Sequence, residues 1–340
     1  MSAYSTMLEY GTRLETLVDT LNRATPLYIS GVAVAIGFRM NLFNIGVEGQ
    51  YRLAAIVSAY VGAQLNLWGP LHVLIIIVVA MSVGSAYAAI PGVLKVTRGV
   101  NEVISTIMLN AISVALASYL LVNWSIADET LNTATEQIPK SGRMPDLNRI
   151  AEIFTREIVK GRELRGFLII AILVGIAYHL LINRTRIGFD LRATGSNPFA
   201  AHASGVPPGR TIVIAMALSG LVAGLVGLPQ ILGDTYRYDL NFTALLGFNG
   251  IAVALVGRNH PGGIAIGALL FGFLDSVAVV LDFSGDAPRE IVIIMQAVII
   301  FSVVVGYEVV RRIRATEEAR AAAEALATRP EAVSYTHLRA

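Results

Sequence analysis

Cysteine is absent from this 340-residue sequence, and charged residues are scarce. Without cysteine there can be no disulfide, no thiolate metal site and no cysteine nucleophile. Asp, Glu, Lys and Arg together make up 15% of the residues, whereas a soluble domain carries roughly a quarter. Because 55% of the residues are hydrophobic and the mean hydropathy is +0.64, water cannot be the main solvent of this chain.

Several motifs that mark enzymes and ATP-binding proteins are missing as well. No G-x-x-x-x-G-K-[ST] loop occurs, so the chain does not bind ATP through a P-loop, and no H-E-x-x-H pair predicts a zinc site. The sequence shows no convincing nucleophile constellation. We therefore expect a protein that is not an enzyme by itself and that has no catalytic residue, metal or cofactor. The net charge of +2 gives no reason to expect a nucleic-acid partner.

Long apolar runs fill the sequence instead. No Asp, Glu, Lys or Arg lies between Arg52 and Lys95, which is enough for two membrane helices of about 20 residues each. Other uncharged runs lie at residues 103–127, 166–183, 211–233, 240–257, 259–274 and 291–307. These runs predict an all-α polytopic membrane protein with about eight to nine membrane-embedded helices, some of them broken or re-entrant.

Basic residues set the expected topology through the positive-inside rule. They gather in three places, namely Lys95 with Arg98, residues 184–210 with four arginines, and residues 311–314 with three. We expect a polar amino-terminal segment at 1–25, a membrane domain at 26–310 and a cytoplasmic tail at 311–340. Within the membrane domain, loop 124–165 is expected outside the cell and loop 184–210 in the cytoplasm.

A polar insert interrupts the apolar sequence at residues 43–50, which read Phe-Asn-Ile-Gly-Val-Glu-Gly-Gln. Gly46 and Gly49 each weaken a helix by about 1 kcal/mol relative to alanine. An ionisable residue such as Glu48 is costly at membrane depth and marks a candidate functional site. The insert is therefore the first place to look for function.

Two interpretations of this insert stay open on the pattern alone. In the first, a broken helix lies beside a substrate path, and Asn44, Glu48 and Gln50 line that path. In the second, the insert is a cytoplasmic turn in which Glu48 is solvated and pairs with Arg52 four residues later.

A second polar motif begins another apolar run at Asn101. Glu102, Thr106 and Asn110 follow at spacings of four residues, which places them on one face of a helix. This stripe could line a path, or it could hydrogen-bond to neighbouring helices and stabilise the bundle. Glu102 could also be a carboxylate that favours a helix start. We keep Asn101, Glu102, Thr106 and Asn110 as candidate path residues.

The third motif lies in the arginine-rich loop. Asn197 is a good N-cap and Pro198 suits the first helical position. Gly205 supplies a helix stop, so a helix of about two turns is expected between them. Arg192, Gly195, Asn197, Pro198 and Gly205 are candidates for contact with a partner protein, and the alternative is an ordinary connecting helix.

A fourth motif, Leu-Gly-Phe-Asn-Gly at residues 246–250, repeats the theme of glycines and an asparagine in an apolar run. It adds Asn249 to the candidate path residues. Two glycine pairs have the G-x-x-x-G spacing that is typical of close helix packing; they are Gly220 with Gly224 and Gly263 with Gly267.

Four of these segments recur in the same order in one family. They are residues 24–27 (Ala-Thr-Pro-Leu), 43–50, 99–106 (Gly-Val-Asn-Glu-Val-Ile-Ser-Thr) and 192–198 (Arg-Ala-Thr-Gly-Ser-Asn-Pro). Together they resemble the ABC importer permeases of the ribose and branched-chain amino acid type. The subgroup that this chain resembles comprises the nucleoside permeases that work with a basic-membrane-lipoprotein type of receptor. The resemblance covers roughly residues 20 to 312.

The resemblance implies a multi-pass permease subunit of the bacterial cytoplasmic membrane. Its implied partners are a homologous second permease subunit, a cytoplasmic ATP-binding subunit, an extracytoplasmic substrate-binding lipoprotein and membrane lipid. It also implies that residues 44–50 and 101–110 line the path and that residues 192–205 engage the ATPase. Members of the family begin with a further membrane helix, so we expect residues 1–25 to follow a helix that this sequence lacks.

We therefore expect an ATP-driven importer subunit for a small neutral polar solute, with nucleosides or purine-like compounds first. Uncharged polar side chains such as Asn44 and Asn110 suit a neutral solute that forms hydrogen bonds. The alternatives are a simple-sugar ABC permease and an ion-coupled secondary transporter that uses Glu48 and Glu102.

Overall fold

The computed structural model describes residues 7, 9–125, 133–148, 163–285, 288 and 290–327. This part of the chain is helical apart from turns, loops and three isolated β-bridges, as expected for an all-α membrane protein. The chain divides into two units, residues 1–293 and 294–340, and each is considered by itself.

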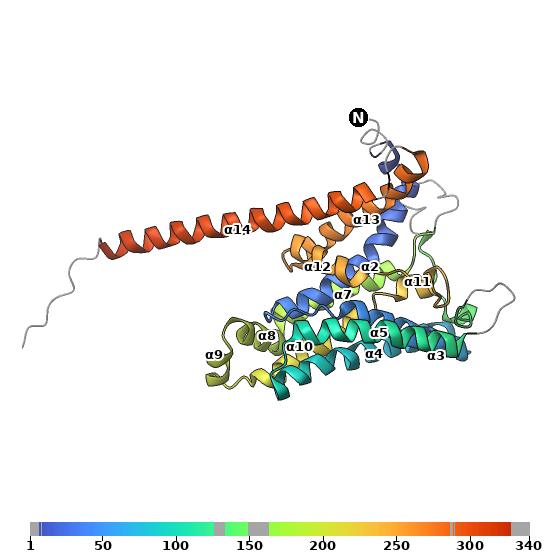
Figure 1. Ribbon diagram of the computed structural model, residues 1–340, viewed down its shortest axis with the longest axis horizontal. Coiled ribbons are helices and arrows are strands. Elements are labelled where there is room, and N and C mark those ends of the chain that lie inside the picture. Colours follow the sequence, from blue (N-terminus) through green and yellow to red (C-terminus); the bar gives the residue numbers. More distant parts are fainter. Residues whose placement is uncertain are drawn as a thin grey trace, which may run out of the picture. The chain divides into compact units, whose positions relative to one another are not determined.

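The first unit contains most of the helices (Figure 1). In chain order they are α2 (Leu14–Phe38), α3 (Val47–Gln64), α4 (Gly69–Arg98), α5 (Glu102–Trp124), the short η1 (Lys140–Gly142), α7 (Phe167–Arg184), α8 (Arg186–Ser196), α9 (Pro198–Ala203), α10 (Pro208–Ala223), α11 (Leu228–Gly233), α12 (Leu246–Val256) and α13 (Pro261–Ser284). The last helix, α14 (Glu290–Ala327), lies almost wholly in the second unit.

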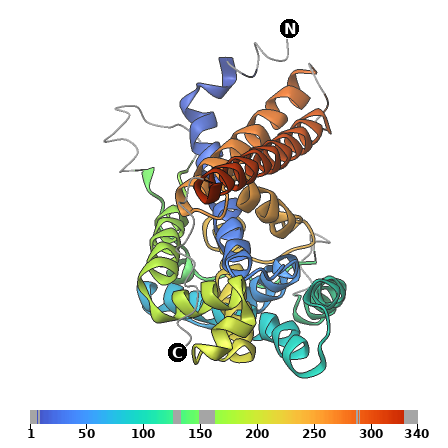
Figure 2. The same ribbon diagram turned by 90° about the vertical axis from the view of Figure 1, so that its left-hand side faces the viewer.

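Helix α2 is the centre of the first unit. It packs against α7, α10, α12 and α13, and Figure 2 shows it passing between α7 on one side and α13 on the other. A second group of neighbours consists of α3, α4, α5 and α10, in which α4 packs most extensively on α10 and α3 lies between α4 and α5. Through α2 and α3, the two groups share one core.

Five helical segments in the described residues are long and apolar enough to cross a membrane. They are Gly69–Arg98, Glu102–Trp124, Phe167–Arg184, Pro208–Gly233 and Pro261–Ser284. This supports a polytopic membrane protein, although it does not confirm the expected count of eight to nine. The shorter apolar helices are Leu246–Val256 and the first part of α14, Glu290–Val303.

The least apolar of the long helices are the most buried ones. Neither α2 nor α3 reaches the hydropathy of a candidate span, yet most of their residues are buried inside the chain. In contrast, only 22% of the most apolar window of α4 and 28% of those of α5 and α7 are buried. Side chains that face lipid must be apolar, whereas side chains that face other helices can be polar if they are hydrogen-bonded.

Helix α2 runs without interruption from Leu14 to Phe38, across the segment boundary expected at residue 25. Its first half packs against α13. At Gly272 of α13, a β-carbon would lie 2.8 Å from both the Thr20 carbonyl oxygen and the Ala24 nitrogen, so the two backbones are in close contact. Tertiary contact thus keeps residues 14–25 helical, although their composition is polar.

The boundary expected at residue 310 also falls inside a helix, since α14 continues from Glu290 to Ala327. Residues 328–340 lie outside the described part of the chain. The same holds for residues 126–132 and 149–162 of loop 124–165. The rest of this loop contacts the segment between α11 and α12. Thr135 N donates to the Tyr238 carbonyl (2.9 Å) and Ile138 N donates to the Tyr236 carbonyl (2.8 Å).

Small residues bring α4 and α10 into backbone contact, as the G-x-x-x-G spacing predicts. A β-carbon at Gly220 would overlap Ala88 and the Gly84 carbonyl, and one at Gly224 would overlap the Ala80 carbonyl. The second pair packs α13 on the end of α12, since Gly263 lies against the Gly257 carbonyl. These contacts place α10, and therefore Ser219, against α2.

Replacement of Gly220 by leucine is expected to lower the free energy of unfolding by about 3 kcal/mol or more, because the new side chain meets backbone that cannot move away. The measurement is the melting temperature in detergent, read as the loss of the monodisperse peak in size-exclusion chromatography. The matched control is Gly306→Leu, since nothing lies within 4 Å of a β-carbon there. Equal melting temperatures for the two variants would contradict the packing argument.

Candidate functional site

The polar insert forms the beginning of α3, and its side chains are hydrogen-bonded to one another. Asn44 and Gln50 pair reciprocally, with Asn44 Nδ2 donating to Gln50 Oε1 (3.1 Å) and Gln50 Nε2 donating to Asn44 Oδ1 (3.0 Å). Asn44 Oδ1 also accepts from Gly46 N (3.0 Å). Both amide side chains belong to residues that are 1% exposed, so the insert is not a solvated turn.

Hydrogen bonds to α10 and α5 hold this insert in place inside the bundle. Asn44 Nδ2 donates to Ser219 Oγ (2.8 Å), which in turn donates to the Ala33 carbonyl of α2 (2.6 Å). Asn110 of α5 donates to the Ile45 carbonyl (3.0 Å) and accepts from Gly49 N (2.9 Å). Asn110 lies two turns, about 12 Å, beyond the first residue of α5. The insert is therefore well inside the bundle.

Gly49 permits this approach of α3 to α5. A β-carbon at Gly49 would lie 2.8 Å from Asn110 Oδ1 and would overlap Ser113 Oγ. The stripe expected on α5 is present, because Glu102, Thr106 and Asn110 are all buried on the same face. Its first member pairs with the end of α4, where Lys95 Nζ lies 2.5 Å from Glu102 Oε2.

Glu48 is buried and fully engaged. Its Oε1 accepts from Tyr51 Oη (3.0 Å), Arg52 Nε (2.8 Å) and Leu245 N (2.9 Å), and its Oε2 accepts from Gly247 N (3.0 Å). The pairing with Arg52 was expected from the spacing, but solvation of Glu48 was not correct, since the residue is 4% exposed. The carboxylate belongs to α3 and accepts hydrogen bonds from the beginning of α12.

This contact satisfies the amino-terminal end of α12. The first backbone N–H groups of a helix have no partner within the helix, and they favour a negative charge. Leu245 precedes α12 with a left-handed backbone (φ 68°) and has no side-chain cap of its own. The Glu48 carboxylate from another helix takes the place of that cap.

A positive charge lies just past the opposite end of α12. Arg39 Nη2 donates to the Asn259 carbonyl (2.8 Å), and its Nε lies 3.3 Å from Tyr178 Oη. The Tyr178 hydroxyl donates to the same Asn259 carbonyl (2.8 Å). Cations stabilise the carboxyl end of a helix. Glu48 on α3 lies at the beginning of α12, and Arg39, just past the end of α2, lies beyond the end of α12. The two residues thus bracket α12 with the two charges that its dipole favours.

Not all the predicted path residues come together. Asn44 pairs with Gln50, Asn110 bonds to the backbone of the insert and Glu48 bonds to the start of α12, so these four surround residues 44–50. Thr106 packs against Gly46. Asn101 is an exposed N-cap that accepts from Val103 N (2.8 Å), and Asn249 is half-buried on α12. The partners Ser219, Tyr51 and Arg39 were missed. Ser219 lies 175 residues from Asn44, whereas Tyr51, three residues after Glu48, could have been found from its spacing.

The arginine-rich loop folds into two short helices. The expected helix is α9, with Asn197 Oδ1 accepting from the backbone nitrogens of residues 199 and 200 (3.0 and 3.1 Å), Pro198 in its first turn and Gly205 beyond it at φ 82°. Helix α8 precedes it and was not expected. Its start has a recognisable signal in Thr185, whose hydroxyl accepts from Gly188 N (3.1 Å).

Helix α8 ends against the connection between α2 and α3. Asn41 Nδ2 donates to the Gly195 carbonyl (2.6 Å), and a β-carbon at Gly195 would lie 2.6 Å from Met40 Cα. Arg192 carries a buried guanidinium nitrogen, Nη1, that has no hydrogen-bond partner among the described residues. On α9, Phe199 is 89% exposed. The loop thus contacts the connection between α2 and α3, just before the polar insert, and presents an apolar ring to the surroundings at Phe199.

Comparison with known proteins gives consistent matches over most of the chain. A family model described as "Branched-chain amino acid transport system / permease component" matches residues 16–304. The guanosine ABC transporter permease protein NupP of Bacillus subtilis is 34% identical over 283 residues, which cover 82% of this chain and 78% of the relative.

Two further relatives have similar coverage. The nucleoside ABC transporter permease protein NupB of Lactococcus lactis is 29% identical over 82% of this chain and 77% of its own length. The glucose ABC transporter permease protein TsgB13 of Haloferax volcanii is 29% identical over 83% of this chain and 74% of its own length. No solved structure matches the chain.

Replacement of Glu48 by glutamine is expected to lower the free energy of unfolding by about 3 kcal/mol or more, as when one partner of a buried ion pair is removed. Glutamine has the same shape, but it brings an NH₂ group against N–H donors and leaves Arg52 without its counter-charge. Thermal unfolding in detergent measures the change.

The matched control is an exposed Glu–Arg pair at the same spacing, Glu9 with Arg13, whose side chains are 69% and 49% exposed. Glu9→Gln is expected to change stability by about 1 kcal/mol or less. If Glu48→Gln were equally mild, the carboxylate would not be what holds α12 in place.

Proposed function

Because the chain belongs to the family of branched-chain amino acid transport system permease components, we propose that it is one of two homologous membrane subunits of an ATP-driven importer for nucleosides or purine-like compounds. A separate cytoplasmic subunit hydrolyses ATP, and an extracytoplasmic lipoprotein delivers the solute. The chain is then a transport subunit rather than an enzyme, and its place is the bacterial cytoplasmic membrane.

The choice of solute rests on two observations. Two of the three relatives described above are named for guanosine or nucleoside transport, and the third is named for glucose. In addition, the buried polar side chains around the start of α3 are amides and hydroxyls, with the exception of Glu48. The charge of Glu48 is already balanced by Arg52. Amides both donate and accept, which suits the edges of a neutral nucleobase.

The observation that carries the proposal is the meeting of two helix beginnings inside the membrane domain. Helices α3 and α12 both start there, and Gly247 lies directly against the backbone of Glu48. Transporters place such helix breaks beside the solute site, because freed backbone groups are tolerated only where they line a cavity or contact protein. We assign the path to the wall made by residues 44–50, residues 101–110 and Asn249.

The connection to the ATPase follows from the position of α8. Residues 192–205 offer the partner an exposed ring at Phe199. Any displacement of Gly195 would act on Met40 and Asn41, which lie four and three residues before Asn44. The loop is therefore suited to transmit motion from the ATPase to the polar wall.

The same proposal accounts for the number of embedded segments. Helices α2, α3 and α12 and the apolar first part of α14 would be embedded in addition to the five candidate spans. Together these segments reach the expected eight to nine. The family of ATP-driven permeases and the engaged state of Glu48 and Glu102 both argue against an ion-coupled transporter.

The proposed solute can be tested with the complete importer in proteoliposomes, assembled with its ATPase and solute receptor. We expect ATP-dependent uptake of guanosine and other nucleosides and no uptake driven by an ion gradient alone. Uptake of glucose without nucleosides would favour the sugar alternative. ATPase stimulation by the loaded receptor without nucleoside uptake would contradict the solute assignment.

The same assay tests the path. Asn249→Leu is expected to lower the maximal uptake rate about three- to ten-fold, which corresponds to the loss of one hydrogen bond. The control is Phe248→Leu at the neighbouring position, which is 42% exposed and apolar. If both variants transported like the wild type, Asn249 would not contact the solute.

Replacement of Gly195 by alanine is expected to reduce stimulation of the ATPase by the loaded receptor about five-fold or more, the range of an ordinary coupling free energy. The added methyl group displaces Met40 and so separates α8 from the connection between α2 and α3. Ser196→Ala, at the exposed neighbouring position, is the control and should remain coupled. Unchanged coupling in Gly195→Ala would argue against transmission through this contact.

A further inference from the structure

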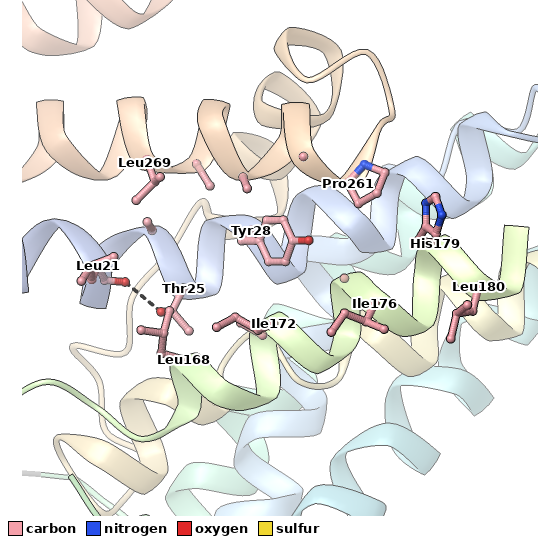
Figure 3. A pocket seen from close by; sticks show the side chains of 16 residues that line it. Leu21, Thr25, Tyr28, Leu168, Ile172, Ile176, His179, Leu180, Pro261 and Leu269 are labelled. Atoms are coloured by element: carbon pink, nitrogen blue, oxygen red, sulfur yellow. Dashed lines mark hydrogen bonds between the residues drawn. The ribbon is translucent and has the colours of Figure 1, made fainter. Parts of the chain in front are cut away.

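An apolar groove runs along α2 between α7 and α13, away from the polar network (Figure 3). Its volume is about 470 Å³, within the range of roughly 300–1,000 Å³ that is common for small-molecule sites. One wall is a stripe on α7 made by Leu168, Ile172, Ile176 and Leu180 at spacings of four residues. Leu269 of α13 lies on the opposite wall.

Almost no polar group is available along the length of the groove. Thr25 of α2 lines it, but its hydroxyl donates to the Leu21 carbonyl (2.8 Å), as Figure 3 shows. Tyr28 is the exception. Its ring lies between the walls over Gly175, where any side chain would overlap the phenol oxygen, and its hydroxyl points along the groove toward His179 and Pro261. The groove is thus apolar along most of its length and polar toward one end.

That end carries several basic side chains. His179 of α7 lies at the groove, and its ring is 6.5 Å from the ring of His260, next to Pro261 of α13. Arg39 hydrogen-bonds to the hydroxyl of Tyr178, which precedes His179, and to the carbonyl of Asn259, which precedes His260. The stripe on α7 continues four residues beyond Leu180 to Arg184, which is exposed.

No acidic residue offsets these groups in the segments that form the groove. Residues 20–47, 165–189 and 258–274 contain no Asp or Glu. The charge pattern places this end at the cytoplasmic face, since Arg184 belongs to the arginine-rich loop. The cytoplasmic leaflet carries the anionic lipids, and basic residues between helices at that face bind lipid headgroups.

We propose that the groove holds one acyl chain of an anionic glycerophospholipid from the cytoplasmic leaflet. The phosphate lies among His179, His260 and Arg184, and the Tyr28 hydroxyl, about one turn further into the membrane, donates to an ester carbonyl. The apolar walls hold the chain. An apolar helix from a partner subunit would fill the same groove, but it would leave the Arg184 guanidinium beside it without a counter-charge, which is costly in a membrane.

The test uses the purified full-length protein in detergent with phosphatidylglycerol or phosphatidylcholine of identical chains, and native mass spectrometry counts the bound lipid. We expect one phosphatidylglycerol per chain, in clear preference to phosphatidylcholine. Arg184→Gln should weaken that preference about five-fold, the effect of one cation near the membrane surface. Its control, Arg186→Gln at the first residue of α8, should leave the preference unchanged.

A second variant tests the groove without altering charge. Ala265→Phe puts a ring into the groove from α13 and should abolish retention of either lipid, whereas Ala177→Phe, on an exposed position of α7 outside the groove, should not. Equal retention of the two lipids by the wild type, or undiminished retention in Ala265→Phe, would overturn the proposal.

The alternative occupant is tested in the assembled importer. Since the chain has no native cysteine, Ile172→Cys can carry a single spin label at the groove. Broadening of its spectrum by spin-labelled phosphatidylglycerol supports lipid in the groove. Immobilisation of the label without such broadening would show a protein segment there and would contradict the proposal.

Discussion

The bracketing of α12 by Glu48 and Arg39 is the constraint around which the membrane domain is arranged. A helix of 11 residues rises about 16 Å, half the thickness of a bilayer core, so it is too short to cross a bilayer by itself. Its first N–H groups are satisfied by a carboxylate from α3, and a guanidinium from the end of α2 lies just past its last turn. The positions of α2, α3 and α12 therefore depend on one another.

This constraint gives Glu48, the charged residue of the polar insert, a structural role. Glu48 already has four donors around it, three at Oε1 and one at Oε2. The residues able to exchange partners are the amides, Asn44, Gln50 and Asn110, whose hydrogen bonds are neutral and individually weak. The charged groups thus fix the geometry, and the neutral groups are the ones that a neutral solute could displace.

Local features of the site could be predicted from the sequence, whereas its long-range contacts could not. The cap at Asn197, the stripe on α5 and the pairing of Glu48 with Arg52 all follow from spacings of two to eight residues. The contact of Glu48 with Gly247 joins residues 199 positions apart, and no periodicity encodes it. The contact of the beginning of α2 with Gly272 of α13 likewise joins distant residues, and composition does not encode it.

The central position of the least apolar helices has a consequence for how the protein enters the membrane. Helices α2 and α3 are made early, yet neither is apolar enough to be stable in lipid by itself. Helix α3 is covered mainly by α4 and α5, which follow it directly, whereas α2 is buried by α7, α10, α12 and α13, which are synthesised later. The burial of α2 in the bundle is therefore completed only when the second half of the chain has been synthesised.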